Sequence, residues 1–130
     1  MTRKIIFTLA AAFLATGHAA AWEGDPGRGA ELYGKRCGKC HTTKQHKIGP
    51  KHEGLIGRKA GSVPGFAFSA ALRSADFIWD ERRLYDWLRN PRKMVPGTRM
   101  GTRVSLDQDR KDLIAYLATL PRPQQPAKSD

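Results

Sequence analysis

The sequence has only two cysteines and lacks an apolar run long enough to cross a membrane. Two cysteines in 130 residues exclude the disulfide-rich scaffold of many small secreted domains. The longest apolar stretch runs from Ile5 to about Ala15, short of the ~20 residues that a membrane-spanning helix needs. A small core with so few cross-links would gain stability from a buried prosthetic group.

The N-terminus has the pattern of a secretory signal peptide. Arg3 and Lys4 precede the apolar run, and the small residues 19–21, all alanine, follow it as a cleavage site. We expect cleavage after Ala21, with a retained membrane anchor as the alternative. The folded domain would then span residues 22–120, and the Pro- and Gln-rich tail at 121–130 is expected to be disordered.

The two cysteines stand in the segment Cys37-Gly-Lys-Cys40-His41. This C-x-x-C-H spacing is the attachment pattern of haem c. Two thiols separated by two residues can reach the two vinyl-derived carbons on one haem edge, and the next side chain then points at the iron. The pattern predicts one covalent haem c with His41 as an axial ligand.

Three other readings of the cysteines are weaker. A thioredoxin-like redox motif needs a βαβ setting, which the chain does not show. A zinc site would need two more ligands, and His46 and His52 match no zinc-finger spacing. A plain disulfide would leave His41 unexplained.

The regular elements indicated by the sequence are helices separated by loops. They are expected from Pro26 to about Arg36, at 69–74, at 80–90, in a short turn after Pro91, and from Ser105 to Leu120. Glycines and prolines mark the segment 42–68 as a loop, and a loop of that length is explained if it wraps a haem.

Capping and periodicity refine these helices. Asp25 and Asp80 are expected N-caps, and Ser105 with Gln108 forms a possible capping box. Three sets of residues are expected on inner faces: Gly29, Ala30 and Tyr33; Leu84, Trp87 and Leu88; and Leu106, Leu113, Tyr116, Leu117 and Leu120.

The sixth iron ligand decides between electron transfer and chemistry on a substrate. The candidate donors are Met94, Met100, His46 and His52. Met100 is favoured because it follows a rigid Pro-Gly turn on a loop, where a methionine has no obvious core role. The two histidines follow His41 so closely that the opposite haem face looks out of reach.

Further motifs extend over most of the domain. They are Gly29 with Tyr33, the cysteine segment, Ile48-Gly49-Pro50, Gly54 to Gly61, Pro64-Gly65-Phe66, Trp79, Asn90-Pro91, Pro96-Gly97-Thr98-x-Met100, and Asp112 to Leu117. In this order they resemble class I cytochrome c, the group of mitochondrial cytochrome c and bacterial cytochrome c2. The resemblance implies an all-α cytochrome c fold, in which the N- and C-terminal helices cross and long loops wrap one haem.

The resemblance also implies roles for individual residues. Met100 would be the second axial ligand, and the Pro50 carbonyl would fix the imidazole tautomer of the proximal histidine. Arg58 and Trp79 would donate to a buried haem propionate, and Thr98 would lie near one.

Four positions depart from the family pattern. Phe68 and Trp87 stand where the family usually has tyrosines, Leu72 where it often has an asparagine, and His52 where it usually has a leucine. From Phe68, Leu72 and Trp87 we hypothesise a drier Met100 side with a simpler hydrogen-bond network. His52 puts in question how the loop after Pro50 packs on the haem.

The expected function is that of a monomeric periplasmic electron carrier, not an enzyme. The chain has 23 basic and 12 acidic residues, and its export argues against a nucleic-acid partner. The basic excess suits acidic redox partners, such as a bc1-type complex, an oxidase, a reaction centre or a dehydrogenase. The alternatives are a haem enzyme or gas sensor with an open sixth site, or a subunit of a larger complex.

Overall fold

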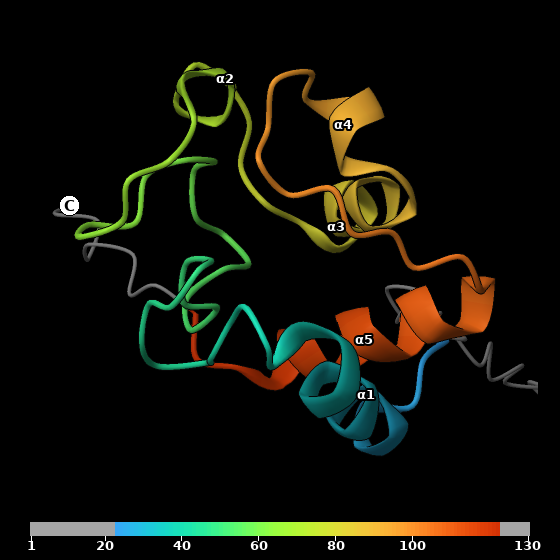
Figure 1. The fold of residues 1–130 in the computed structure, drawn as a ribbon. Helices are drawn as coiled ribbons and strands as arrows, with labels where there is room; N and C mark the ends of the chain where they lie inside the picture. Colours follow the sequence, from blue (N-terminus) through green and yellow to red (C-terminus); the bar gives the residue numbers. More distant parts are fainter. Residues whose placement is uncertain (1–22, 123–130) are drawn as a thin grey trace, which may run out of the picture.

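The computed structural model describes residues 23–122, which form helices joined by long loops (Figure 1). The elements are α1 (Pro26–Leu32), η1 (Tyr33–Cys37), α2 (Ala70–Arg73), α3 (Glu81–Arg89), α4 (Pro91–Met94) and α5 (Asp107–Thr119). Within that part of the chain, β-pairing is limited to one bridge between Lys59 and Ile78. The all-α prediction is confirmed. The expected signal peptide, and the tail beyond Arg122, lie outside the described residues.

None of the helices in residues 23–122 is long and apolar enough to span a bilayer.

The first helix begins as the sequence predicts and then changes form. The Asp25 carboxylate accepts hydrogen bonds from Gly27 N (2.8 Å) and Arg28 N (3.2 Å), which caps α1 ahead of Pro26. Beyond Leu32 the helix widens into the π-helical turn η1, so the cysteine segment begins inside a helix. Of the expected inner face, Gly29 and Tyr33 are buried, but Ala30 is exposed and its prediction is wrong.

Helices α1 and α5 pack against each other and cross, as Figure 1 shows. Gly29 makes the close crossing possible, because a Cβ there would lie 2.0 Å from the carbonyl oxygen of Asp112. One turn further along, the rings of Tyr33 and Tyr116 lie 5.2 Å apart. The crossing fixes where the cysteine segment leaves the helical part of the molecule.

Buried carboxylates reinforce this crossing. Arg28 bridges Asp109, at 2.6 Å, and Asp112, which is only 1% exposed. Burial alone would raise the pKa of Asp112, but a hydrogen bond from Asp25 N (2.8 Å) and the guanidinium of Arg28 hold it below its usual value. The segment before α1 is therefore tied to α5 by charge as well as by packing.

Helix α5 begins later than predicted. Leu106 is its N-cap, makes no side-chain capping bond and is 61% exposed. Instead of closing a capping box, the Gln108 amide donates to Glu23 O (3.1 Å) and Asp112 Oδ1 (2.9 Å). The predictions of a Ser105 capping box and of a buried Leu106 are wrong, because Gln108 holds the chain that enters α1.

Helices α3 and α4 follow the predicted caps. Asp80 accepts from Arg83 N at 2.7 Å, and the inner face of α3, formed by Leu84, Trp87 and Leu88, is buried. Asn90 ends α3 and caps α4 through a bond from Lys93 N (3.2 Å). This pair of helices carries the chain to the loop that holds Met100.

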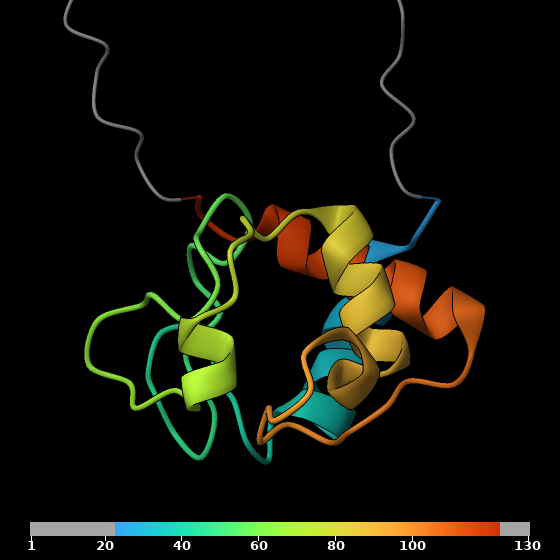
Figure 2. The ribbon, with the colours of Figure 1, turned by 90° about the horizontal axis from the view of Figure 1, so that it is seen from above.

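The segment 42–68 has no helix or extended strand, and side chains hold it in place. His46 connects two parts of it, because its Nε2–H donates to Pro64 O (2.9 Å) and its Nδ1 accepts from Lys51 N (3.0 Å). Figure 2 shows this loop half on one side and helices α1, α3, α4 and α5 on the other. The candidate site lies between the two halves.

The crossing at Gly29 can be tested by adding a single methyl group. We expect Gly29→Ala to destabilise the native protein by about 1–3 kcal/mol, because the helices must move apart. Gly34→Ala is the matched control, since a Cβ at Gly34 meets nothing within 4 Å and alanine favours helix. Urea unfolding followed by circular dichroism measures both; equal losses in the two variants would contradict this account of the crossing.

Candidate haem site

A cavity of about 280 Å³ lies between the helical half and the loop half. Its wall is mostly apolar and includes Leu55, Phe66, Phe68, Leu72, Leu84 and Leu88. The eight site residues predicted from the sequence also line the cavity: Cys37, Cys40, His41, Pro50, Arg58, Trp79, Thr98 and Met100. Residues that are far apart in the sequence are thus brought to one site.

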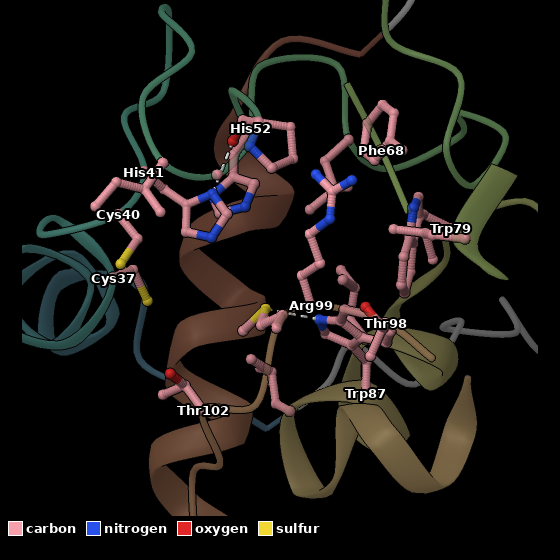
Figure 3. Close-up of a pocket in the computed structure, with 18 of the residues that line it drawn as sticks. Cys37, Cys40, His41, His52, Phe68, Trp79, Trp87, Thr98, Arg99 and Thr102 are labelled. Atoms are coloured by element: carbon pink, nitrogen blue, oxygen red, sulfur yellow. Dashed lines mark hydrogen bonds between the residues drawn. The ribbon is translucent and has the colours of Figure 1, made fainter. Parts of the chain in front are cut away.

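The cysteine segment turns tightly at the end of η1. Cys40 N and His41 N both donate to Cys37 O, at 3.0 and 2.8 Å. Cys37 and Cys40 are free thiols on one side of the cavity, with Phe68 and Trp79 on the other side (Figure 3). Burial raises the pKa of the Cys37 thiol to about 11. Both sulfur atoms are placed to bond to the same edge of a planar group.

His41 is held in one tautomer. Its Nδ1–H donates to the carbonyl of Pro50 at 2.7 Å, which leaves the Nε2 lone pair free of any partner among residues 23–122. Burial lowers the pKa of His41, so the neutral form is favoured. Gly49 lies against the ring: a Cβ there would be 2.2 Å from His41 Cε1. The imidazole therefore has little room to turn away from the cavity.

The four candidates for the sixth ligand differ in whether they line the cavity and on which side of it they lie. Met94 packs on the core and His46 uses both nitrogens in loop contacts, and neither lines the cavity. His52 lines the cavity but stacks on His41, with ring centroids 4.2 Å apart and planes 23° apart. His52 is thus beside the proximal imidazole, and Met100 is the remaining donor.

Met100 is oriented by a tryptophan. The indole Nε1–H of Trp87 donates to Met100 Sδ at 3.3 Å, the bond drawn as a dashed line at Trp87 in Figure 3. The hypothesis of a simpler network on this side is therefore wrong for Trp87, which keeps a donor to the sulfur. Phe68 and Leu72 do follow that hypothesis, since both are buried and bring no polar group to the cavity.

Three donors face the cavity without an acidic partner among the described residues. Arg58 donates to the carbonyls of Glu53 (3.1 Å) and Lys51 (3.2 Å), and burial lowers its pKa. The indole N–H of Trp79 and the hydroxyl of Thr98 have no acceptor in residues 23–122, although both residues are buried. These groups suit an anionic substituent of a bound molecule.

Sequence reasoning missed two contacts at the site. Arg99 crosses from the Met100 loop to donate to Ala67 O at 2.8 Å, so it joins two loops. The other contact is a hydrogen bond of 2.9 Å between the Tyr33 hydroxyl and His52 Nδ1. Burial, followed by the charges of His41 and Arg58, holds the pKa of His52 well below its usual value. The sequence marks His52 as a candidate ligand and as a departure from a leucine, and neither observation indicates a bond to Tyr33.

These observations fit the predicted haem. An apolar cavity, two thiols on one side, a nitrogen and a sulfur donor, and a partly buried cation without a carboxylate match the edge, axial positions and propionates of haem c. They do not favour zinc, because no group of three His, Cys, Asp or Glu side chains in the described part of the chain could hold a metal ion.

Comparison with known proteins gives a consistent result. The family model for cytochrome c matches residues 27–121. The chain is 43% identical over 98 residues to cytochrome c of Sesamum indicum, covering 72% of this chain and 88% of that protein. It is 41% identical over 100 residues to cytochrome c of Euglena viridis, covering 75% and 98%. Cytochrome cH from Methylobacterium extorquens is similar in structure, with a TM-score of 0.70 and 39% identity, covering 74% of this chain and 99% of that one.

The bond from Trp87 to the Met100 sulfur can be tested through the midpoint potential of the haem. Trp87→Phe removes the donor, and an unbonded thioether donates more strongly to ferric iron. We expect the potential to fall by up to about 60 mV, the equivalent of one hydrogen bond. Trp87→Tyr, which still offers a donor, should stay closer to wild type. A redox titration in which Trp87→Phe matches wild type would refute the role of the indole N–H.

Proposed function

The chain belongs to the cytochrome c family, and we propose that it carries single electrons between redox partners in the periplasm. Membership brings the all-α fold, one covalent haem c, and electron transfer in place of enzymatic turnover. The periplasmic location is proposed from the signal-peptide pattern at residues 1–21. The residue roles that follow are proposed from the cavity.

The observation that carries this function is the placement of Met100. Its sulfur lines the same cavity as the free Nε2 of His41 and is held there by Trp87. We assign His41 and Met100 as the two axial ligands, and Cys37 and Cys40 as the covalent attachment. The haem supplies a one-electron Fe(II)/Fe(III) couple, and thioether ligation favours the ferrous state. If His41 and Met100 both hold the iron, no coordination position would be left for a substrate.

The remaining residues of the cavity have supporting roles. Arg58, Trp79 and Thr98 would donate to the haem propionates, which lets these charges be buried at lower cost. The apolar side chains of Phe68 and Leu72 line the cavity and would exclude water from the surface of a bound haem. Pro50 keeps the proton of His41 on Nδ1, so the Nε2 lone pair is available to the iron.

The basic surface is the proposed docking site for acidic redox partners. Eight exposed residues form the basic docking set: Lys35, Arg36, Lys39, Lys44, Lys47, Arg92, Lys93 and Arg99. Arg36 pairs with Asp109 at 3.1 Å, whereas Lys39 and Lys44 have no ion pair within residues 23–122. Ile48, which is 78% exposed, also lines the cavity and offers an apolar contact beside these charges.

Such a surface would speed encounter with a bc1-type complex, an oxidase, a reaction centre or a dehydrogenase. The chain is proposed to act there as a diffusing monomer.

Carbon monoxide tests the closed sixth position. We expect the reduced wild-type protein at neutral pH not to bind carbon monoxide, because the Met100 sulfur would hold the sixth coordination position of the iron. Met100→Ala should bind the gas rapidly and completely. Absorption spectroscopy in the Soret region measures both, and rapid binding by the wild type would contradict a closed electron carrier.

The docking surface is tested by local charge reversal. We expect Lys39→Glu with Lys44→Glu to slow oxidation of the reduced protein by membranes of the source organism about 10-fold or more at low salt, with the difference shrinking as salt is raised. Arg82→Glu with Arg89→Glu changes the net charge equally on α3 and is the control. Equal slowing in both pairs, or rates that do not depend on ionic strength, would argue against a localised docking site.

A further inference from the structure

One side chain in the cavity has no part in the proposed function. His52 follows Pro50 by two residues and lines the cavity, but it lies on the His41 side and its Nδ1 is already hydrogen-bonded. It therefore does not supply the sixth ligand. Figure 3 shows its ring next to that of His41, and the two planes are 23° from parallel.

Tyr33 anchors His52 from the helical half. Its hydroxyl is 2.9 Å from His52 Nδ1, and the two rings meet edge to face, with centroids 5.6 Å apart. Tyr33 is itself buried, 7% exposed, and packs on Tyr116 of α5. A continuous line of contacts thus runs from the helix crossing through Tyr33 and His52 to His41.

The stacking of His52 on His41 restrains a motion of the His41 ring that the hydrogen bond to Pro50 leaves free. The hydrogen bond from Nδ1 to Pro50 O lies at the edge of the ring and fixes one direction within its plane. A single bond at the edge still allows the ring to tilt about the line of that bond. The His52 ring, stacked on the face of His41, blocks this tilt.

An apolar residue would not make the same contact. A leucine at position 52 could fill space, but it would leave the buried hydroxyl of Tyr33 without its partner, and it has no flat face to set an angle. Tyr33 and His52 therefore work as a pair: the hydroxyl sets the angle of the His52 ring, and that ring sets the angle of His41.

We propose that His52, anchored by Tyr33, is a positioning residue that fixes the plane of the His41 imidazole and thereby the electronic structure of the haem iron. This inference rests on the proposed function, in which His41 is an axial ligand. The orientation of an axial imidazole determines how unpaired spin is distributed over the haem. It can therefore be measured directly in the oxidised protein.

The test uses the hyperfine-shifted haem-methyl resonances of the ferric holoprotein, measured by proton NMR, with the midpoint potential as a second readout. The variants are Tyr33→Phe, His52→Leu and the double variant. Tyr116→Phe is the matched control, because Tyr116 belongs to the same aromatic cluster. Its hydroxyl makes no hydrogen bond within residues 23–122.

We expect both single variants to change the pattern of methyl shifts in the same sense, with the larger change in His52→Leu. The double variant should match His52→Leu, because the Tyr33 hydroxyl acts only through His52. Tyr116→Phe should keep the wild-type pattern. An unchanged pattern in either single variant, additive changes in the double variant, or an equal change in Tyr116→Phe would overturn the proposal.

Two features keep the outcome clear. If His52→Leu does not mature, Tyr33→Phe alone decides, since it loses one oxygen atom and keeps the packing. Failure of the proposed function is seen separately, as carbon monoxide binding to the wild type. If only this inference fails, the wild type does not bind carbon monoxide, but the haem-methyl shifts of the variants do not change as expected.

Discussion

The hydrogen bond from His41 Nδ1 to the carbonyl of Pro50 joins the two halves of the molecule. His41 comes at the end of the helical segment α1–η1, whereas Pro50 belongs to the long loop. The bond sets the tautomer of the imidazole, and Gly49 can approach the ring only because it has no Cβ. A second bond, from Gly49 N to Cys40 O at 2.7 Å, holds the same loop against the cysteine segment.

The two halves are stabilised in different ways. The helical half has a close crossing at Gly29 and ion pairs of Arg28 with the buried carboxylates of Asp109 and Asp112. The loop half depends on side chains such as His46 that bond to backbone groups, and on whatever fills the cavity. Covalent haem c supplies that filling, which explains how a segment as long as 42–68 can do without regular structure.

Much of the fold and site follows from local rules. The N-caps Asp25 and Asp80 and the end of α3 at Asn90 depend only on neighbouring residues, so they can be predicted from the sequence. The order of the motifs shared with the family predicts five further site residues, and all of them line the cavity: Pro50, Arg58, Trp79, Thr98 and Met100.

What the sequence does not show depends on residues distant in the chain. The side chain of Gln108 does not form the expected capping box with Ser105. It donates instead to the carbonyl of Glu23, before α1, and to the carboxylate of Asp112. Trp87 keeps a donor to Met100, and Tyr33 meets His52, through contacts that cross between elements. No periodicity encodes such contacts.

The pairing of Tyr33 with His52 also has a consequence for how sequences of this kind diverge. Replacing either residue alone leaves a polar group of the other without its partner, whereas replacing both by apolar residues removes both polar groups. We therefore expect the two positions to covary. Relatives with a leucine at the histidine position are then expected to carry phenylalanine at the tyrosine position.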